Sequence, residues 1–253
     1  MLRLIDTHAH LDEIEDLDEQ IAEAKKAGLA AIIAVGSDLS SNQRVLEIAN
    51  LHRGFVFPAL GWHPWYIRED EIDANLEFIA ANIDKAVGVG EIGLDYHKRV
   101  RAVASKDLQK SVLEELLIIA VEHDKPALIH SRYAWRDAYD AVDRAGLEKA
   151  LFHWYTGTSS VLRDIINRGY YISVTPAVEY HEEHRRAVKE APLGQLLLET
   201  DSPVTYGRGS DREFVASPAD VRRSLKIAAE LKGLTEEEIA AVTTENAEKL
   251  FGL

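Results

Sequence analysis

The first residues of the chain that could do chemistry are two histidines separated by one alanine, His8 and His10. They follow the short apolar run of residues 2–5 and the carboxylate Asp6. If that run is a strand that continues, residues two apart point to the same face, and both imidazoles could hold one metal ion. A pair of ordinary loop histidines is the alternative, because the His-x-His spacing alone is a weak signal.

Five more residues suited to acid–base or metal chemistry follow short apolar runs further along the chain. They are His63, Glu91, His130, His153 and Asp201. Glu91 lies among glycines, in Val89-Gly90-Glu91-Ile92-Gly93, where packing gives little reason for a carboxylate and where its two oxygens could bridge two cations. The alternatives are a glutamate that stabilises a turn and histidines that are simply hydrogen-bonded in the core.

Asp201 emerges from a strongly apolar run and could both bind a metal and take a proton from water. For Glu199 the simpler interpretation is support of neighbouring ligands through hydrogen bonds. His63, in Gly61-Trp62-His63-Pro64, could bind a substrate phosphate or protonate a leaving group. A capped turn with aromatic packing is the alternative for His63.

Apart from His63, these residues offer four imidazoles and two carboxylates, which is more than one cation needs. Two divalent cations about 3.5–4 Å apart that share Glu91 could hold a hydroxide and polarise a phosphoryl oxygen. Mixed histidine and carboxylate ligands favour zinc, manganese or nickel, and suit magnesium less well. The chain has no cysteine, so thiolate ligands and disulfides are excluded.

The elements that must position these residues alternate along the chain. Short apolar stretches predict strands, and longer amphipathic stretches between them predict helices. The predicted strands are residues 2–5, 30–35, 55–60, 86–89, 127–129, 150–152, 170–173 and 195–198. The predicted helices are residues 17–27, 42–51, 72–82, 107–123, 132–145, 159–167, 181–190 and 218–231, with Thr235 and Glu238 as a capping box that opens a final helix.

Eight strand–helix units in one series predict an α/β fold, a (β/α)8 TIM barrel that forms a single domain over residues 1–253. An open doubly wound sheet is the alternative, but it would typically carry a glycine-rich phosphate loop after an early strand, and none is present. The carboxyl ends of barrel strands converge on one face. Candidate residues far apart in the sequence would therefore meet in one small volume.

The net charge of -14 argues against a surface that coats nucleic acid broadly, although bound cations could still allow a phosphate substrate at one site. Basic residues that follow predicted strands could contact a polyanion, unless they simply form solvated loops. They are His97, Lys98, Arg99, Arg101, Arg132 and Arg208. No apolar run has membrane-spanning length, and the N-terminus leaves no room for a signal peptide, so we expect a cytoplasmic protein without a membrane partner.

Ordered motifs that cover essentially the whole chain resemble those of one protein family. The motifs are Ile5-Asp6-Thr7-His8-Ala9-His10-Leu11-Asp12, Gly61-Trp62-His63-Pro64, Gly90-Glu91-Ile92-Gly93-Leu94-Asp95-Tyr96, Ile129-His130-Ser131-Arg132, His153-Trp154-Tyr155-Thr156-Gly157, Glu199-Thr200-Asp201-Ser202-Pro203 and the closing Glu245-Asn246-Ala247-Glu248-Lys249-Leu250-Phe251. The chain resembles the TatD family of metal-dependent deoxyribonucleases, within the amidohydrolase superfamily. The resemblance is weaker in the helix before His130, where Leu113 and Leu116 occupy the places of a family aromatic residue and a family glutamine.

The resemblance implies a nuclease that cleaves phosphodiester bonds of DNA with metal-activated water at a binuclear site. It implies that one cation is bound by His8, His10, Glu91 and Asp201. It implies that the other cation is bound by Glu91, His130 and His153. It further implies that Asp201 is the general base and that His63 lies near the substrate phosphate.

Two other functions are compatible with the same ligands. An amide or ester hydrolase, for example one that deacylates aminoacyl-tRNA, would use the same cation chemistry. Superfamily members of that type often bridge their metals with a modified lysine, where this chain has Glu91. A binding protein without catalysis would be expected to have lost Asp201 or the bridging ligand, and both are present.

Overall fold

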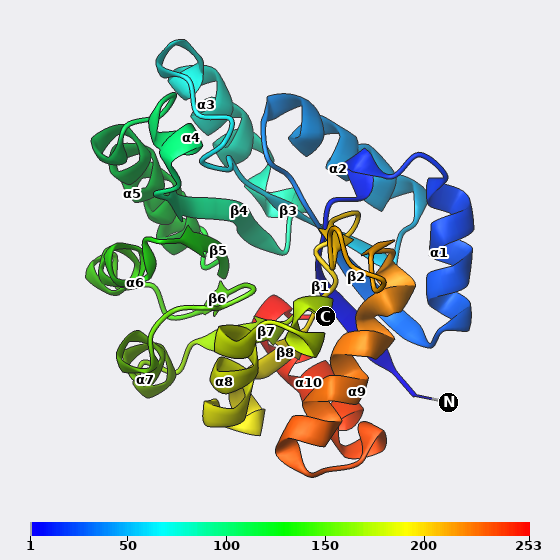
Figure 1. The fold of residues 1–253 in the computed structure, drawn as a ribbon. Helices are drawn as coiled ribbons and strands as arrows, with labels where there is room; N and C mark the ends of the chain where they lie inside the picture. The colour runs from blue at the N-terminus through cyan, green and yellow to red at the C-terminus, as the bar shows by residue number, and fades with distance from the viewer. Residues whose placement is uncertain (1) are drawn as a thin grey trace.

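Eight parallel strands form a barrel, and helices surround it (Figure 1). The computed structural model describes residues 2–253, so Met1 of the predicted domain lies outside the described residues. The strands are β1 (Leu4–Ala9), β2 (Leu29–Val35), β3 (Val56–Leu60), β4 (Gly88–Asp95), β5 (Ala127–Arg132), β6 (Ala150–Phe152), β7 (Tyr171–Val174) and β8 (Leu196–Leu198). Each strand pairs with the next in chain order, which confirms the predicted (β/α)8 barrel.

The helices lie on the outside of the barrel and at its amino end. They are α1 (Leu17–Lys26), α2 (Leu39–Leu51), α3 (Ile72–Asn82), α4 (Lys98–Arg101), α5 (Lys106–Glu122), α6 (Trp135–Arg144), α7 (Ser159–Asn167), α8 (Glu182–Glu190), α9 (Val221–Lys232) and α10 (Glu236–Phe251). The predicted helices agree with them to within three residues at each end. Within residues 2–253, no helix is long and apolar enough to cross a membrane.

The last strand returns to the first, and this contact closes the barrel beside the candidate site. The backbone N–H of Asp201 donates to the carbonyl of His8 at 2.9 Å, and the N–H of His10 donates to the carbonyl of Ser202 at 2.8 Å. The hydroxyl of Thr7 also donates to the carbonyl of Leu198 at 3.0 Å. Residues nearly two hundred positions apart are therefore held side by side by backbone hydrogen bonds.

The strand side chains alternate between two apolar layers, as expected for strands buried on both faces. Leu4 and Ile32 belong to the large cluster that packs against the surrounding helices. Their chain neighbours Ile5 and Ile33 belong to a second cluster, which also contains Phe251 from the end of α10. The second cluster fills the barrel interior, and α10 covers its amino end.

Three strands run further than the sequence predicts, and this corrects the position of three candidate ligands. His8, Glu91 and His130 lie within β1, β4 and β5 rather than after them. Parallel pairing continues past the apolar runs, because Gly93 pairs with His130 and Asp95 pairs with Arg132. The prediction that Arg132 begins a helix was wrong for the same reason.

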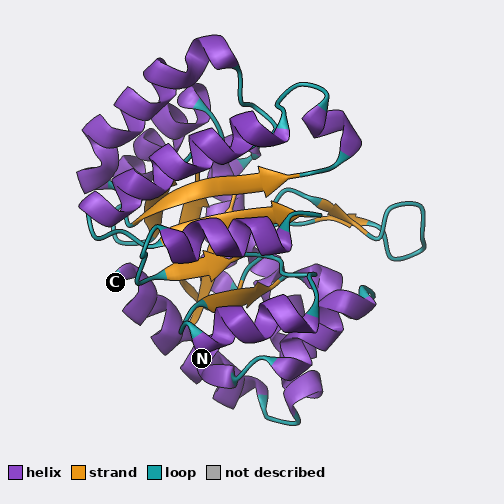
Figure 2. Cartoon of the chain, turned by 90° about the vertical axis from the view of Figure 1, so that its left-hand side faces the viewer, coloured by secondary structure: helices purple, strands orange, loops and turns teal. Residues whose placement is uncertain are grey.

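A short hairpin and a short helix were not predicted. Strands β9 (Thr205–Tyr206) and β10 (Phe214–Val215) pair antiparallel and project from the side toward which the barrel strands point (Figure 2). The helix α4 has four residues and follows β4. Elements this short carry too few residues to show a hydrophobic period.

Candidate metal centre

All seven candidate residues meet at the carboxyl end of the barrel, although they come from different strands and the loops that follow them. They are His8, His10, His63, Glu91, His130, His153 and Asp201. His10 and His130 are the most accessible, with 14% and 13% of their side chains exposed, and the others are buried. The convergence expected for a barrel is therefore present.

Glu91 lies at the middle of this cluster, and its two oxygens face different histidines. Oε2 lies 3.3 Å from Nε2 of His8 and 3.3 Å from Nε2 of His10. Oε1 lies 2.9 Å from Nδ1 of His130 and 2.7 Å from Nε2 of His153. The carboxylate thus divides four imidazoles into two pairs, one for each of its oxygens.

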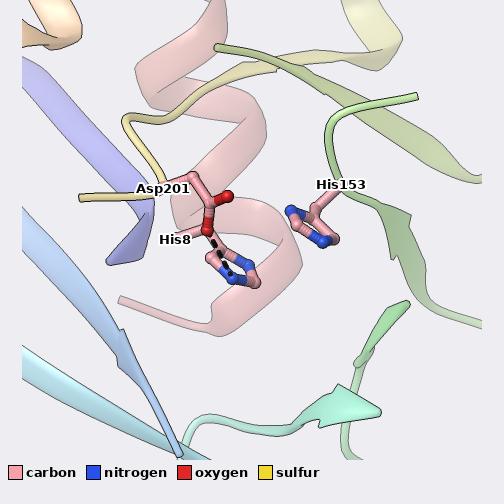
Figure 3. Close-up of side chains that lie close together, drawn as sticks. All are labelled: His8, His153 and Asp201. Carbon is pink, nitrogen blue, oxygen red and sulfur yellow. Dashed lines mark ion pairs between the residues drawn. The ribbon is translucent and has the colours of Figure 1, made fainter. Parts of the chain in front are cut away.

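Asp201 joins the pair on the Oε2 side. Its Oδ1 lies 3.5 Å from Nε2 of His8 and 3.4 Å from Nε2 of His10, and Figure 3 shows its carboxylate directed at the His8 ring. Its backbone has a φ of 50°, a left-handed conformation that is uncommon for aspartate and that costs energy unless the surroundings hold it. The hydrogen bond from its N–H to His8 helps to hold it.

The donor set fits divalent cations. Three groups of three ligand atoms lie close enough together to hold an ion: His8, His153 and Asp201; His8, His10 and Glu91; His63, Glu91 and His130. Within residues 2–253, both ring nitrogens of His8, Nε2 of His130 and Nδ1 of His153 are buried without a hydrogen-bond partner. Buried polar atoms are normally paired, so unpaired nitrogens directed at carboxylates indicate a site for cations.

The charges at the centre also suit cations. Burial opposes ionisation of Glu91, but the adjacent His63 and His153 hold its pKa well below the usual value. For Asp201 burial is likewise the largest influence, and the hydrogen bond from His10 leaves its pKa lowered. Both carboxylates are therefore ionised at neutral pH.

His63 differs from the other histidines in the direction of its ring nitrogens. Its Nδ1 accepts the backbone N–H of Trp65 at 3.2 Å, so the ring proton is on Nε2, which lies 3.5 Å from Oε1 of Glu91. Burial is the main influence on His63 and lowers its pKa well below the usual value. The neutral ring therefore presents a donor to the centre rather than a lone pair for a metal.

Two of the candidate ligand histidines have an orienting partner on, or just beyond, a neighbouring strand. Nδ1 of His10 lies 3.3 Å from the hydroxyl of Ser37, beyond the end of β2. Nε2 of His130 lies 3.4 Å from Oδ2 of Asp95 on β4. Such partners fix the ring orientation and tautomer of a metal-binding histidine.

Asp95 is fixed by a network that includes a residue missed by the sequence analysis. The side chain of Gln109, buried in α5, accepts the backbone N–H of Asp95 at 2.8 Å and donates to its carbonyl at 3.0 Å. Trp65 and Arg132 donate to Oδ2 of Asp95 at 2.6 and 2.8 Å. In this helix, Leu113 and Leu116 were singled out from the sequence, but Gln109, which lies one turn before Leu113, was not. The only signal in the sequence was a single glutamine within a helix predicted to be amphipathic.

The backbone of Glu91 is held by a close approach of β3 and β4. A Cβ added at Gly61 would lie 2.4 Å from the carbonyl carbon of Gly90 and 2.5 Å from the backbone nitrogen of Glu91, so only glycine fits. The side-chain amide of Asn42 donates to the carbonyl of Gly61 at 2.7 Å and accepts its N–H at 3.0 Å. These contacts explain why a glycine occupies position 61, beside the backbone of Glu91.

Aromatic and basic side chains border the centre. Trp65 is 47% exposed, and the guanidinium of Arg132 lies 5.2 Å from the centre of its ring. Tyr133, next to Arg132, is 62% exposed. Lys98, Arg99 and Arg101 on α4 and Arg208 in the β9–β10 loop are also accessible. The basic groups could contact the charges of an anionic substrate, and the aromatic side chains could stack on aromatic rings of that substrate.

Comparison with known proteins places the chain in a family. The sequence model described as TatD related DNase matches residues 5–252, and the chain therefore belongs to the TatD family. It is a metal-dependent hydrolase by class, as the resemblance predicted.

Individual relatives match along nearly their whole length. The human protein "Deoxyribonuclease TATDN3" is 32% identical, with 98% of this chain and 94% of that protein covered. The Bacillus subtilis "Uncharacterized metal-dependent hydrolase YabD" is 35% identical, with 98% of both chains covered. The crystal structure of YJJV, a TatD homologue from Escherichia coli K12, superposes with a TM-score of 0.89 at 28% identity and covers 99% of this chain and 98% of that one.

Proposed function

We propose that this chain is a deoxyribonuclease that hydrolyses phosphodiester bonds at a centre of two divalent cations. The division of four imidazoles between the two oxygens of Glu91 is the observation that carries this proposal, because one carboxylate can bridge two cations. The name of the human relative supports DNA as the substrate. The amide or ester alternative gains no support from the relatives, and a purely binding role is disfavoured because every candidate ligand is in place.

In this proposal the two oxygens of Glu91 assign the ligands. His8, His10 and Asp201 share the Oε2 side, and His130 and His153 share the Oε1 side. Zinc, manganese and nickel suit this donor set best, and magnesium suits it less well. Bound there, such cations supply Lewis-acid activation of water and of the phosphoryl group.

The protein groups then have separate tasks. Asp201 is ionised and lies beside His10, on the side of the centre that Oε2 of Glu91 faces. It accepts a proton from the attacking water. The water oxygen forms a bond to phosphorus, the P–O ester bond breaks, and the departing oxygen takes up a proton and leaves as an alcohol. His63 donates its Nε2–H to a phosphate oxygen and stabilises the charge that develops there.

The surroundings of the centre support an extended anionic substrate. Arg132 and the basic residues of α4 lie on the carboxyl side of the barrel and could contact flanking phosphates. We further propose that the chain acts as one catalytic unit, because ligands from β1 and from the segment after β8 complete the same site. The cytoplasmic location stays a prediction from the sequence.

The proposal is tested by assaying the purified chain on single-stranded and duplex DNA with manganese, zinc or magnesium. Asp201→Asn removes the proton acceptor at nearly constant volume, so we expect cleavage to fall by about 100-fold or more. Asp73→Asn, a change at an exposed position in the first turn of α3 that is not among the candidate residues, is the matched control and should leave cleavage unchanged. Equal cleavage by wild type and Asp201→Asn would refute the nuclease assignment.

A further inference from the structure

Glu199 is a fully buried carboxylate directly after β8, behind two of the candidate ligands. Its Oε1 accepts the backbone N–H of Trp154 at 2.9 Å. Its Oε2 has no hydrogen-bond partner within residues 2–253. A buried carboxylate oxygen without a hydrogen-bond donor is energetically costly. We therefore expect a donor to bind Oε2 of Glu199 when the protein functions.

The nearest candidates for this task are the two histidines that have no other orienting partner. Nδ1 of His8 lies 3.9 Å from Oε2 of Glu199, and Nδ1 of His153 lies 3.6 Å from Oε1. Both nitrogens lack a hydrogen-bond partner within the described part of the chain. Small rotations of the rings would bring each nitrogen to hydrogen-bonding distance.

The two rings are arranged as a parallel pair. Their centroids are 4.0 Å apart and their planes differ by 6°. Nε2 of His8 faces Oε2 of Glu91, whereas Nε2 of His153 faces Oε1 of Glu91. The imidazoles therefore belong to opposite sides of the bridging carboxylate, and both point their second nitrogen at Glu199.

Glu199 differs in this respect from the other orienting groups. Ser37 approaches only His10, and Asp95 approaches only His130. Glu199 alone among these three lies between ligands of both proposed cations. Its effect should consequently extend to both halves of the centre.

We propose that Glu199 is a positioning residue shared by the two cation sites, and that it couples their occupancy. This inference rests on the two-cation centre proposed above. When His8 places its proton on Nδ1 and donates it to Oε2, its Nε2 lone pair becomes available to a cation. The same hydrogen bond fixes the Glu199 carboxylate. Its Oε1 then accepts the Nδ1–H of His153, which leaves the Nε2 lone pair of His153 available to the second cation.

The test is a titration of EDTA-treated protein with Co²⁺. Calorimetry measures the binding, and visible absorbance reports on the ligands of the ion. The wild type should bind two Co²⁺ per chain. Glu199→Gln keeps the shape and can still accept the Trp154 N–H, yet it should raise both dissociation constants by about 10- to 100-fold. Ser37→Ala, the matched control, should raise only one of them.

A second pair of variants tests the coupling without changing Glu199. His8→Ala should weaken the remaining Co²⁺ site by about 10-fold more than His10→Ala does, because only His8 is linked to His153 through Glu199. Glu199→Gln binding that matches wild type, or that weakens at one site only, would overturn the inference. A wild-type stoichiometry of one would instead overturn the two-cation centre itself.

Discussion

At the residue scale, the chemistry depends on which ring nitrogen of each histidine faces the carboxylates. His10 presents Nε2 and His130 presents Nδ1, and in each case the other nitrogen lies near an orienting group. His63 is the exception, because the Trp65 N–H occupies its Nδ1. One backbone donor thereby distinguishes His63, the proposed substrate-binding histidine, from the candidate ligands around it.

This orientation leads to a prediction for His63. His63→Ala should lower kcat for DNA cleavage by about 100-fold, because a donor to the developing charge is lost. His63→Gln, which can still donate from its amide, should lose less. Both variants should keep the wild-type metal content, measured by atomic emission on the purified proteins. Loss of a cation from His63→Ala would show that His63 is a ligand instead.

At the scale of elements, the site depends on how closely β3 and β4 approach. Glu91 lies within β4 rather than in a flexible loop, so its two oxygens are directed by the strand backbone. The N–H of Glu91 also donates to the carbonyl of Gly36 at 2.9 Å, which ties it to the end of β2. A change that separates these strands should therefore move the Glu91 carboxylate.

Gly61→Ala is the change that tests this idea. The added Cβ would meet backbone atoms of Gly90 and Glu91 at 2.4–2.5 Å, and backbone cannot rotate away. We expect a loss of about 1–3 kcal/mol in the free energy of unfolding, together with weaker metal binding. Urea denaturation in EDTA and a Co²⁺ titration measure the two effects.

Gly194→Ala is the control for Gly61→Ala. Gly194 lies in the 3-10 turn Leu193–Gln195, and a Cβ added there would have no other group within 4 Å. This variant should keep both stability and metal binding close to wild type. If Gly61→Ala behaves like Gly194→Ala, the close approach of the strands does not limit the site.

At the scale of the whole molecule, a histidine outside the centre should make stability depend on pH. Nε2 of His184 in α8 accepts the N–H of Thr175 at 3.1 Å, and its Nδ1 donates to the carbonyl of Tyr155 at 3.0 Å. Burial lowers the pKa of His184 to about 4. The unfolded chain, with a histidine pKa of about 6.5, therefore binds more protons in the interval between these values.

The sign follows from that difference. The contribution of His184 is fully present above the unfolded pKa and declines as the pH falls toward the folded value. From about pH 7 to about pH 5 it should remove about 2 kcal/mol from the free energy of unfolding. His184→Gln can keep both hydrogen bonds without titrating, so its stability should fall less over this interval. Urea denaturation of both proteins in EDTA measures the difference, and identical pH dependences would contradict it.

Much of the fold was predictable because strand and helix periods are local properties of the sequence. The apolar runs before His153 and Asp201 end where the strands end. The runs before Glu91 and His130 end before their strands do, because pairing between β4 and β5 extends the strands through polar residues and glycine. The β9–β10 hairpin was missed because each of its strands has only two residues.

By itself, the sequence determined which residue types reach the carboxyl end of the barrel and in what order, since strand direction alone places them there. The tertiary structure decided how they are grouped. Only the packed barrel places His8 and His153 in parallel, and only barrel closure brings Asp201 beside His8. The tautomer of His63 and the position of Glu199 between two imidazoles likewise depend on contacts between separate elements, which no local pattern encodes.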